Sequence, residues 1–209
     1  MILLILIFFV LQQPVIFSQS ARQLLEKGST LAEKGELQKA VKYFSRSIEM
    51  DSTVFEAYLG RGDSRRMLED FEGAISDYSR AILLDGSDYR GFFKRAITSC
   101  LKKDYAAALK DYDSAVRLSP ENERLLFGRG CTKYLKKDYD GAISDFTEAL
   151  RLNDENELTA FSRGAAREDM GDITGAIEDY RLAERINPEV KSMEYFIRRA
   201  EDRMKPAKK

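Results

Sequence analysis

The sequence FEGAISDY at residues 71–78 returns as YDGAISDF at 139–146 and as ITGAIEDY at 173–180. The first two octapeptides lie 68 residues apart and the last two 34 apart, which indicates a repeat of 34 residues. The gap holds YAAALKDY at 105–112, and a diverged copy, LQKAVKYF, stands at 37–44. The chain of 209 residues therefore contains five consecutive copies, over 21–54, 55–88, 89–122, 123–156 and 157–190.

Two apolar stripes separated by a polar break recur in each copy. The second stripe is an alanine followed four residues later by an aromatic residue and three later again by a small residue, as in Ala74, Tyr78 and Ala81. This spacing places all three on one face of an α-helix. The first stripe contains a small residue, glycine in four copies and Ala96 in the third, where a neighbouring helix can approach closely. Each copy is therefore predicted to fold as a helix, a short turn and a second helix.

This pattern resembles the tetratricopeptide repeat family, whose unit is a helical hairpin of 34 residues. The resemblance covers residues 21–190, although Ala160 departs from the family's usual tryptophan place. It implies an all-α fold, a right-handed superhelical solenoid of antiparallel helix hairpins. Residues 191–209 carry a further apolar stripe and a basic tail, which predict a capping helix over the last hairpin. Arg198 occupies the small-residue place, which argues against a full sixth copy.

Residues 1–20 have the composition of a targeting segment. Residues 2–11 are apolar without a break, and the first charged side chain is Arg22. Ten apolar residues are too few to span a bilayer but are typical of a secretory signal, with Ser18 and Ser20 placing the cleavage after Ser20. Because no lysine or arginine precedes the run, an uncleaved N-terminal anchor is the alternative. We expect export to the periplasm, the cell envelope or the medium, with a secretory-pathway lumen as the alternative.

Two columns of opposite charge recur in step in four of the five copies. An arginine stands directly before the small residue of the first helix, and an aspartate directly before the aromatic residue of the second helix. The columns are Arg61, Arg95, Arg129 and Arg163, and Asp77, Asp111, Asp145 and Asp179. Because the first copy lacks both, we favour partly buried ion pairs that set how the hairpins stack. The alternative is an arginine ladder that binds an acidic ligand.

The resemblance also implies that the first helices line a concave groove that binds an extended peptide or a partner helix. Positions i, i+4 and i+7 of a first helix share one face, and Glu168 and Asp169 are expected at the far end of this groove. The residues assigned to the middle and flanks are Arg90, Phe93, Ile97, Arg124, Phe127, Tyr134 and Phe161. The alternative is that the three phenylalanines only pack against neighbouring first helices.

The two cysteines, Cys100 and Cys131, fall on facing first helices. They could form a disulfide in an oxidising compartment, but packed helix axes lie about 8–10 Å apart, which is long for disulfide geometry. The alternative is that both are small residues lining the groove.

The composition narrows the functional classes. The chain has no histidine, which excludes a Ser-His-Asp triad and an H-E-x-x-H zinc site, and two cysteines cannot form a Cys₄ zinc site. The 34 lysines and arginines nearly balance the 35 aspartates and glutamates, so charge gives no case for nucleic-acid binding. We expect no cofactor, no metal and no catalysis. The prediction is a scaffold or adaptor that binds another protein; the alternative is a membrane-tethered assembly scaffold that touches a membrane only through its N-terminal segment.

Overall fold

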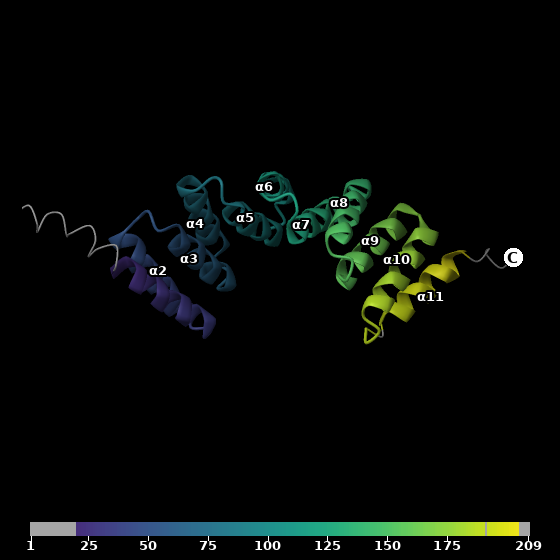
Figure 1. The fold of residues 1–209 in the computed structure, drawn as a ribbon, viewed down its shortest axis with the longest axis horizontal. Helices are drawn as coiled ribbons and strands as arrows, with labels where there is room; N and C mark the ends of the chain where they lie inside the picture. The colour runs from purple at the N-terminus through teal and green to yellow at the C-terminus, as the bar shows by residue number, and fades with distance from the viewer. Residues whose placement is uncertain (1–19, 191, 205–209) are drawn as a thin grey trace, which may run out of the picture. The chain divides into compact units, whose positions relative to one another are not determined.

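The computed structural model describes residues 20–190 and 192–204, and all regular structure in this part of the chain is α-helical. Residues 1–19 of the predicted signal segment and the basic tail over 205–209 lie outside the described residues. The chain divides into two compact units, one ending at Lys102 and one beginning at Lys103 (Figure 1). They are called the N-terminal unit and the C-terminal unit below. None of the described helices is long and apolar enough to cross a membrane.

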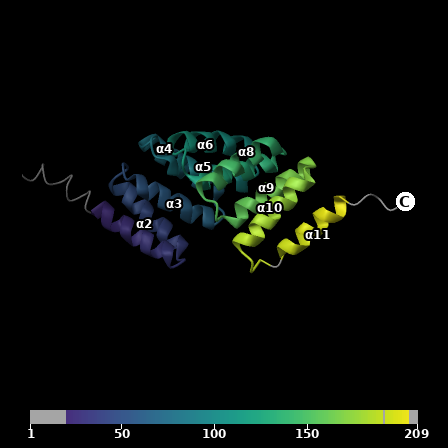
Figure 2. The ribbon, with the colours of Figure 1, turned by 45° about the vertical axis from the view of Figure 1, so that its right-hand side comes forward.

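The helices of each unit pack in the order of the sequence. The N-terminal unit contains a helix over 20–33, α2 (Leu37–Met50), α3 (Phe55–Met67), α4 (Phe71–Leu84) and α5 (Tyr89–Leu101). The C-terminal unit contains α6 (Tyr105–Leu118), α7 (Glu123–Leu135), α8 (Tyr139–Leu152), α9 (Glu157–Met170), α10 (Ile173–Ile186) and α11 (Ser192–Met204). Within each unit consecutive helices are in contact, and α10 lies beside both α9 and α11 (Figure 2). Since the connecting turns are short, packed neighbours run antiparallel, and the predicted all-α fold of helix hairpins is confirmed.

The polar break between the two helices of a hairpin has a fixed geometry. In the last four hairpins the second helix begins after an aspartate whose carboxylate accepts a hydrogen bond from the backbone N–H three residues later, as Asp138 does from Gly141. The same N-cap is made by Asp70, Asp104 and Asp172. In the first hairpin Glu36 stands there and makes no side-chain cap. Just before the N-cap residue, the backbone turns through the left-handed region, with φ of 95° at Gly171 but 64° at Lys137. The Lys-Lys-Asp tips are therefore turns whose second lysine occupies a place that favours glycine.

The alanine and aromatic columns form the core. The five alanines are fully buried, and the aromatic side chains are at most 3% exposed. These residues are Ala40, Ala74, Ala108, Ala142 and Ala176, and Phe44, Tyr78, Tyr112, Phe146 and Tyr180. The rings of Tyr78 and Tyr180 pack directly on a glycine of the first helix of the same hairpin. A Cβ atom at Gly62 would lie 2.6 Å from the ring of Tyr78, and one at Gly164 would lie 2.8 Å from the ring of Tyr180. The small-residue column is thus required by the close approach of the two helices.

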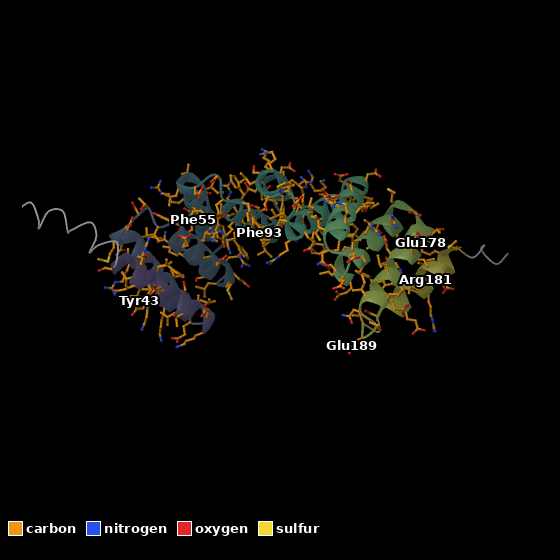
Figure 3. All side chains as sticks on the ribbon, viewed as in Figure 1. Tyr43, Phe55, Phe93, Glu178, Arg181 and Glu189 are labelled. Carbon is orange, nitrogen blue, oxygen red and sulfur yellow. The ribbon has the colours of Figure 1, made fainter. Side chains whose placement is uncertain are left out.

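Helix α11 covers the last hairpin. Its buried face consists of Met193, Ile197 and Ala200, which pack against the clusters around Tyr180 and Leu150. On its outer side Glu201 accepts a hydrogen bond from Arg181 of α10 at 2.9 Å; Arg181 is labelled in Figure 3. The helix therefore buries the apolar surface that the fifth hairpin would otherwise leave open.

Candidate functional site

The predicted arginine and aspartate columns meet inside the hairpins. Arg61 donates to both carboxylate oxygens of Asp77, with Nη2 2.7 Å from Oδ1. The same two-pronged contact joins Arg129 to Asp145 and Arg163 to Asp179. The three carboxylates are at most 4% exposed. Arg95 and Asp111 belong to different units, so their pairing stays a prediction.

Asp77, Asp145 and Asp179 each hold a second cation that the sequence analysis missed. Asp77 accepts from Arg65 at 2.8 Å, Asp145 lies 2.8 Å from the Lys133 ammonium, and Asp179 accepts from Arg167 at 2.9 Å. These cations stand one helical turn after the ladder arginine. The sequence signal was available, because a cation stands 12 residues before the aspartate in all three copies.

The ladder arginines also reach back to the preceding hairpin. The Nη1 of Arg61 donates to Ser45 Oγ on α2, and that of Arg163 donates to Thr147 Oγ1 on α8. Arg95 reaches Ser79 and Arg129 reaches Asp113 in the same way. Each acceptor stands 16 residues before its arginine, as each aspartate of the ladder stands 16 after it. One guanidinium therefore links three helices, and its charge is paired with a carboxylate inside the fold.

In the N-terminal unit, the residues assigned to the groove all lie on α5. Arg90 pairs at 2.6 Å with Asp88, the N-cap residue of α5, and its guanidinium lies 5.1 Å from the ring centre of Phe55. Phe55 and Phe93 are labelled in Figure 3. Phe93 and Ile97 on α5 are partly buried.

The carboxylate of Asp63 on α3 has partners on both α4 and α5. Asp63 accepts from the hydroxyl of Tyr78 at 2.9 Å and from the ammonium of Lys94 at 2.6 Å. Burial, and then the nearby Asp63 carboxylate, raise the pKa of Tyr78 well above its usual value. A buried tyrosine hydroxyl needs an acceptor, and Asp63 provides it.

In the C-terminal unit, the groove phenylalanines pack on the aromatic column of their own hairpins. The ring of Phe127 lies 5.8 Å from that of Phe146, and the ring of Phe161 lies 5.4 Å from that of Tyr180. Phe161 also makes an edge contact with Phe196 of α11, at 4.8 Å between ring centres. Arg124 is exposed at the N-terminal end of α7. Both phenylalanines remain partly exposed, so they combine a packing role with an accessible surface.

A cavity of about 540 Å³ opens between α7, α9 and α11 of this unit. Its walls are aromatic, with Tyr134, Phe161 and Phe196 around it and Phe146 and Tyr180 at its floor. Two small side chains, Cys131 and Ala165, leave the space empty. Cys131 lines the cavity as a small residue. Cys100 lies in the other unit, and the disulfide between the two cysteines stays an untested alternative. The sequence analysis did not predict this cavity.

Two carboxylates stand at the edge of this cavity in different states. Glu168 is 4% exposed and accepts from Tyr180 at 2.7 Å, from Arg199 at 2.6 Å and from Arg203 at 2.8 Å. Burial alone would raise the pKa of Glu168, but these three hydrogen bonds outweigh it and lower the pKa. Asp169 is exposed and accepts from Tyr134 at 2.6 Å. This bond, with burial, raises the pKa of Tyr134 to about 12.

The sequence profile of the tetratricopeptide repeat matches residues 25–89 and 102–157, together more than half of the chain. The chain belongs to the tetratricopeptide repeat family. Proteins of this family act as scaffolds for protein interactions, and the helix hairpins described above are their repeating unit. Among the described residues no group of three or more histidine, cysteine, aspartate or glutamate side chains could hold a metal ion.

Several solved tetratricopeptide repeat structures share the fold. YrrB, described as having an unusual peptide-binding site, is 18% identical with a TM-score of 0.72, over 86% of this chain and 96% of its own. MamA from Desulfovibrio magneticus RS-1 is 16% identical with a TM-score of 0.76, over 83% and 98%. PilF from Pseudomonas aeruginosa is 17% identical with a TM-score of 0.77, over 89% and 85%. At these identities the likeness concerns the fold, and no curated protein matches the chain.

Proposed function

We propose that this protein is an interaction scaffold whose first helices bind a peptide segment or a helix of another protein, with the main anchoring point in the C-terminal unit. The observation that carries the proposal is the aromatic cavity between α7, α9 and α11. Concave sites with apolar walls and a few polar groups at the edge are the usual form of a binding site. The proposal assigns neither a reaction nor a cofactor to the chain.

Two further observations support an anchoring role. Tyr134, Phe161 and Phe196 combine large apolar area with partial exposure, and aromatic residues of this kind contribute strongly at protein interfaces. The similar protein YrrB is described as binding peptides, which shows that such a fold can do so. The ladder arginines, by contrast, are bound to buried aspartates, so the proposal does not use them to hold a ligand.

A variant that fills the cavity tests the proposal. Ala165→Phe adds a ring at a small residue that lines the cavity together with Cys131 and Phe161. Leu158→Phe adds a ring on the same helix at a side chain that is 54% exposed, and serves as the matched control. In a crosslinking pull-down with the full chain, we expect at least one captured protein to be lost with Ala165→Phe and retained with Leu158→Phe. Retention of every captured protein by the filled variant contradicts the proposal.

We also propose that the protein works outside the cytoplasm, with residues 1–20 as a cleaved signal. The support is the unbroken apolar run over 2–11 and the small residues before Ala21. The second candidate, a membrane-tethered assembly scaffold, keeps the same run as an anchor. N-terminal sequencing of the purified protein separates the two, because Ala21 as the first residue excludes the anchor and Met1 excludes cleavage.

A further inference from the structure

We infer that the cavity of the C-terminal unit selects a partner segment in which a bulky apolar side chain stands beside a lysine or arginine. This inference rests on the proposed binding function and adds the chemistry of the partner. The inference follows from the shape of the cavity and from the charges at its edge.

The shape of the cavity fits a bulky apolar side chain. Cys131 on α7 and Ala165 on α9 are small, while the aromatic rings of Tyr134, Phe161 and Phe196 surround the space they leave. The volume of about 540 Å³ is enough for a side chain of the size of phenylalanine or leucine together with part of its own backbone. A polar side chain in this position would lose its water without gaining a partner from the aromatic walls.

Most charges at the edge of the cavity are already paired within the fold. Glu168 is held by Tyr180, Arg199 and Arg203, so its carboxylate is saturated. The guanidinium of Arg199 is engaged with Glu168 and lies 5.1 Å from the ring centre of Phe196. Neither group is left to attract an oppositely charged partner without breaking a contact that holds α11 in place.

Asp169 is the exception. Its carboxylate accepts from the Tyr134 hydroxyl, which is neutral, and it makes no ion pair with any residue that the structure describes. The side chain is exposed at the edge of the cavity. Of the charged residues that line the cavity, Glu168 and Asp169 are negative and Arg199 is positive, so the lining carries a net negative charge. A cation next to the apolar anchor complements it, whereas a carboxylate there would be repelled.

The repeat position that Ala165 occupies in the C-terminal unit holds a charged residue in the second copy, which lies in the N-terminal unit. Asp63 stands 102 residues, or three repeats, before Ala165. Its carboxylate fills the place that is empty around Ala165, and it is already paired with Lys94. Of these two positions, only Ala165 lies beside both an open apolar space and a carboxylate without an ion pair.

The test is a selection of peptides from a phage-displayed random library on the immobilised full chain, with counter-selection on the Ala165→Phe variant. We expect the enriched peptides to contain phenylalanine, leucine or another bulky apolar residue within two positions of a lysine or arginine. One enriched peptide is then synthesised in three forms, unchanged, with the cation replaced by glutamine, and with the apolar residue replaced by alanine. Their dissociation constants are measured by fluorescence anisotropy.

The chain offers a variant that isolates the charge. Asp169→Asn keeps an acceptor for the Tyr134 hydroxyl and removes the negative charge. We expect loss of the peptide's cation to weaken binding to the natural chain about threefold to tenfold and binding to Asp169→Asn hardly at all. Replacing the apolar residue should weaken binding tenfold or more with both chains. Circular dichroism and melting temperature establish that each variant is folded.

The possible results separate the inference from the proposed function. Peptides that need the open cavity but show no preference for a cation, or that bind Asp169→Asn with the same preference, overturn the inference and leave the proposed function standing. If no enriched peptide distinguishes the natural chain from Ala165→Phe, both fall. Enrichment of acidic peptides also overturns the inference.

Discussion

The inner faces of the two units differ although both are built on the same pattern of 34 residues. In the N-terminal unit, Asp63 connects the hydroxyl of Tyr78 to the ammonium of Lys94, so charged and polar groups fill the space between first helices. In the C-terminal unit, Cys131 and Ala165 occupy the same register and leave an aromatic cavity. The buried ladder, by contrast, is the same in both, as Arg61 with Asp77 and Arg163 with Asp179 show.

This difference indicates how the repeat separates stability from recognition. The alanine, aromatic, arginine and aspartate columns lie between the helices of a hairpin and vary little, because each change there would disturb the same packing. The inner positions of the first helices lie outside these columns, and they change from Asp63 to Ala165 while the hairpin is kept. The choice of aromatic residue follows the inner face, since Tyr78 and Tyr180 each donate to a carboxylate on the paired helix.

The largest expected effect concerns the ladder that both units share. Asp179→Ala leaves Arg163 and Arg167 without their buried carboxylate, and we expect the free energy of unfolding to fall by about 3–5 kcal/mol. Asp77→Ala should cost a similar amount, because Arg61 and Arg65 converge on it in the same way. Urea denaturation followed by circular dichroism measures both. The control is the exposed neighbour, Glu178→Ala, and a loss confined to one of the two aspartate variants would show that the ladder is not equivalent in the two units.

A smaller loss is expected when one of two cations is removed. Arg129→Ala leaves Asp145 paired with Lys133, so we expect a loss of about 2–3 kcal/mol. Lys136 is exposed at a hairpin tip, and Lys136→Ala should leave the melting temperature nearly unchanged. Thermal melts of the two variants provide the measurement. Equal melting temperatures would refute the stabilising role of the buried pair.

The attachment of α11 distinguishes the C-terminal unit and should depend on pH. Glu168→Gln removes the charge that holds Arg199 and Arg203, and we expect a loss of about 1–3 kcal/mol at pH 7. The folded-state pKa of Glu168 is lowered, so its contribution is complete above the pKa of the unfolded chain and is lost as the pH falls through the folded-state value. The difference between the natural chain and Glu168→Gln should therefore shrink in acid. A difference that stays constant from pH 7 to pH 3 contradicts this role.

The smallest effects are expected at the hairpin tips, where both units again behave alike. Lys137 and Glu69 have φ of 64° and 62°, a conformation that glycine adopts with less strain. Lys137→Gly and Glu69→Gly should each stabilise the chain by about 0.5–1 kcal/mol, while Gly171→Ala at the equivalent place should destabilise it by about 1 kcal/mol. Thermal melts provide the measurement, and a loss of stability in either glycine variant would contradict the strain at these tips.

Much of the fold could be predicted from the sequence because the contacts that form a hairpin are local and recur with the period. Gly62 and Tyr78 are 16 residues apart, and so are Arg61 and Asp77, so both contacts appear as columns in a single chain. A third column, which contains Ser45 and Thr147, stands 16 residues before the ladder arginines and accepts their hydrogen bonds. The sequence analysis missed this column. It was missed because the residue type changes between serine, aspartate and threonine, although each of these side chains has an oxygen that can accept the hydrogen bond.

The candidate site was predicted less completely. Tyr134 and Phe161 were assigned to the inner face, and both line the cavity. Arg124 was assigned with them but does not line it, and Arg90 is engaged with Asp88. The roles of Phe196 and Arg199 could not be read from a period, because α11 departs from the pattern of the five copies and its side chains have no equivalents to compare.

The sequence by itself determined the hairpin, its length, the positions of its turns and the residues buried between its two helices. These follow from spacings of three, four and 16 residues, which repeat in each copy and fix short-range packing. Only the tertiary structure decided that Cys131 and Ala165 leave a cavity, that α11 closes it with Phe196, and that Glu168 is saturated while Asp169 is not. The physical reason is that an empty space, or an unpaired charge, depends on the side chains that three separate helices bring together.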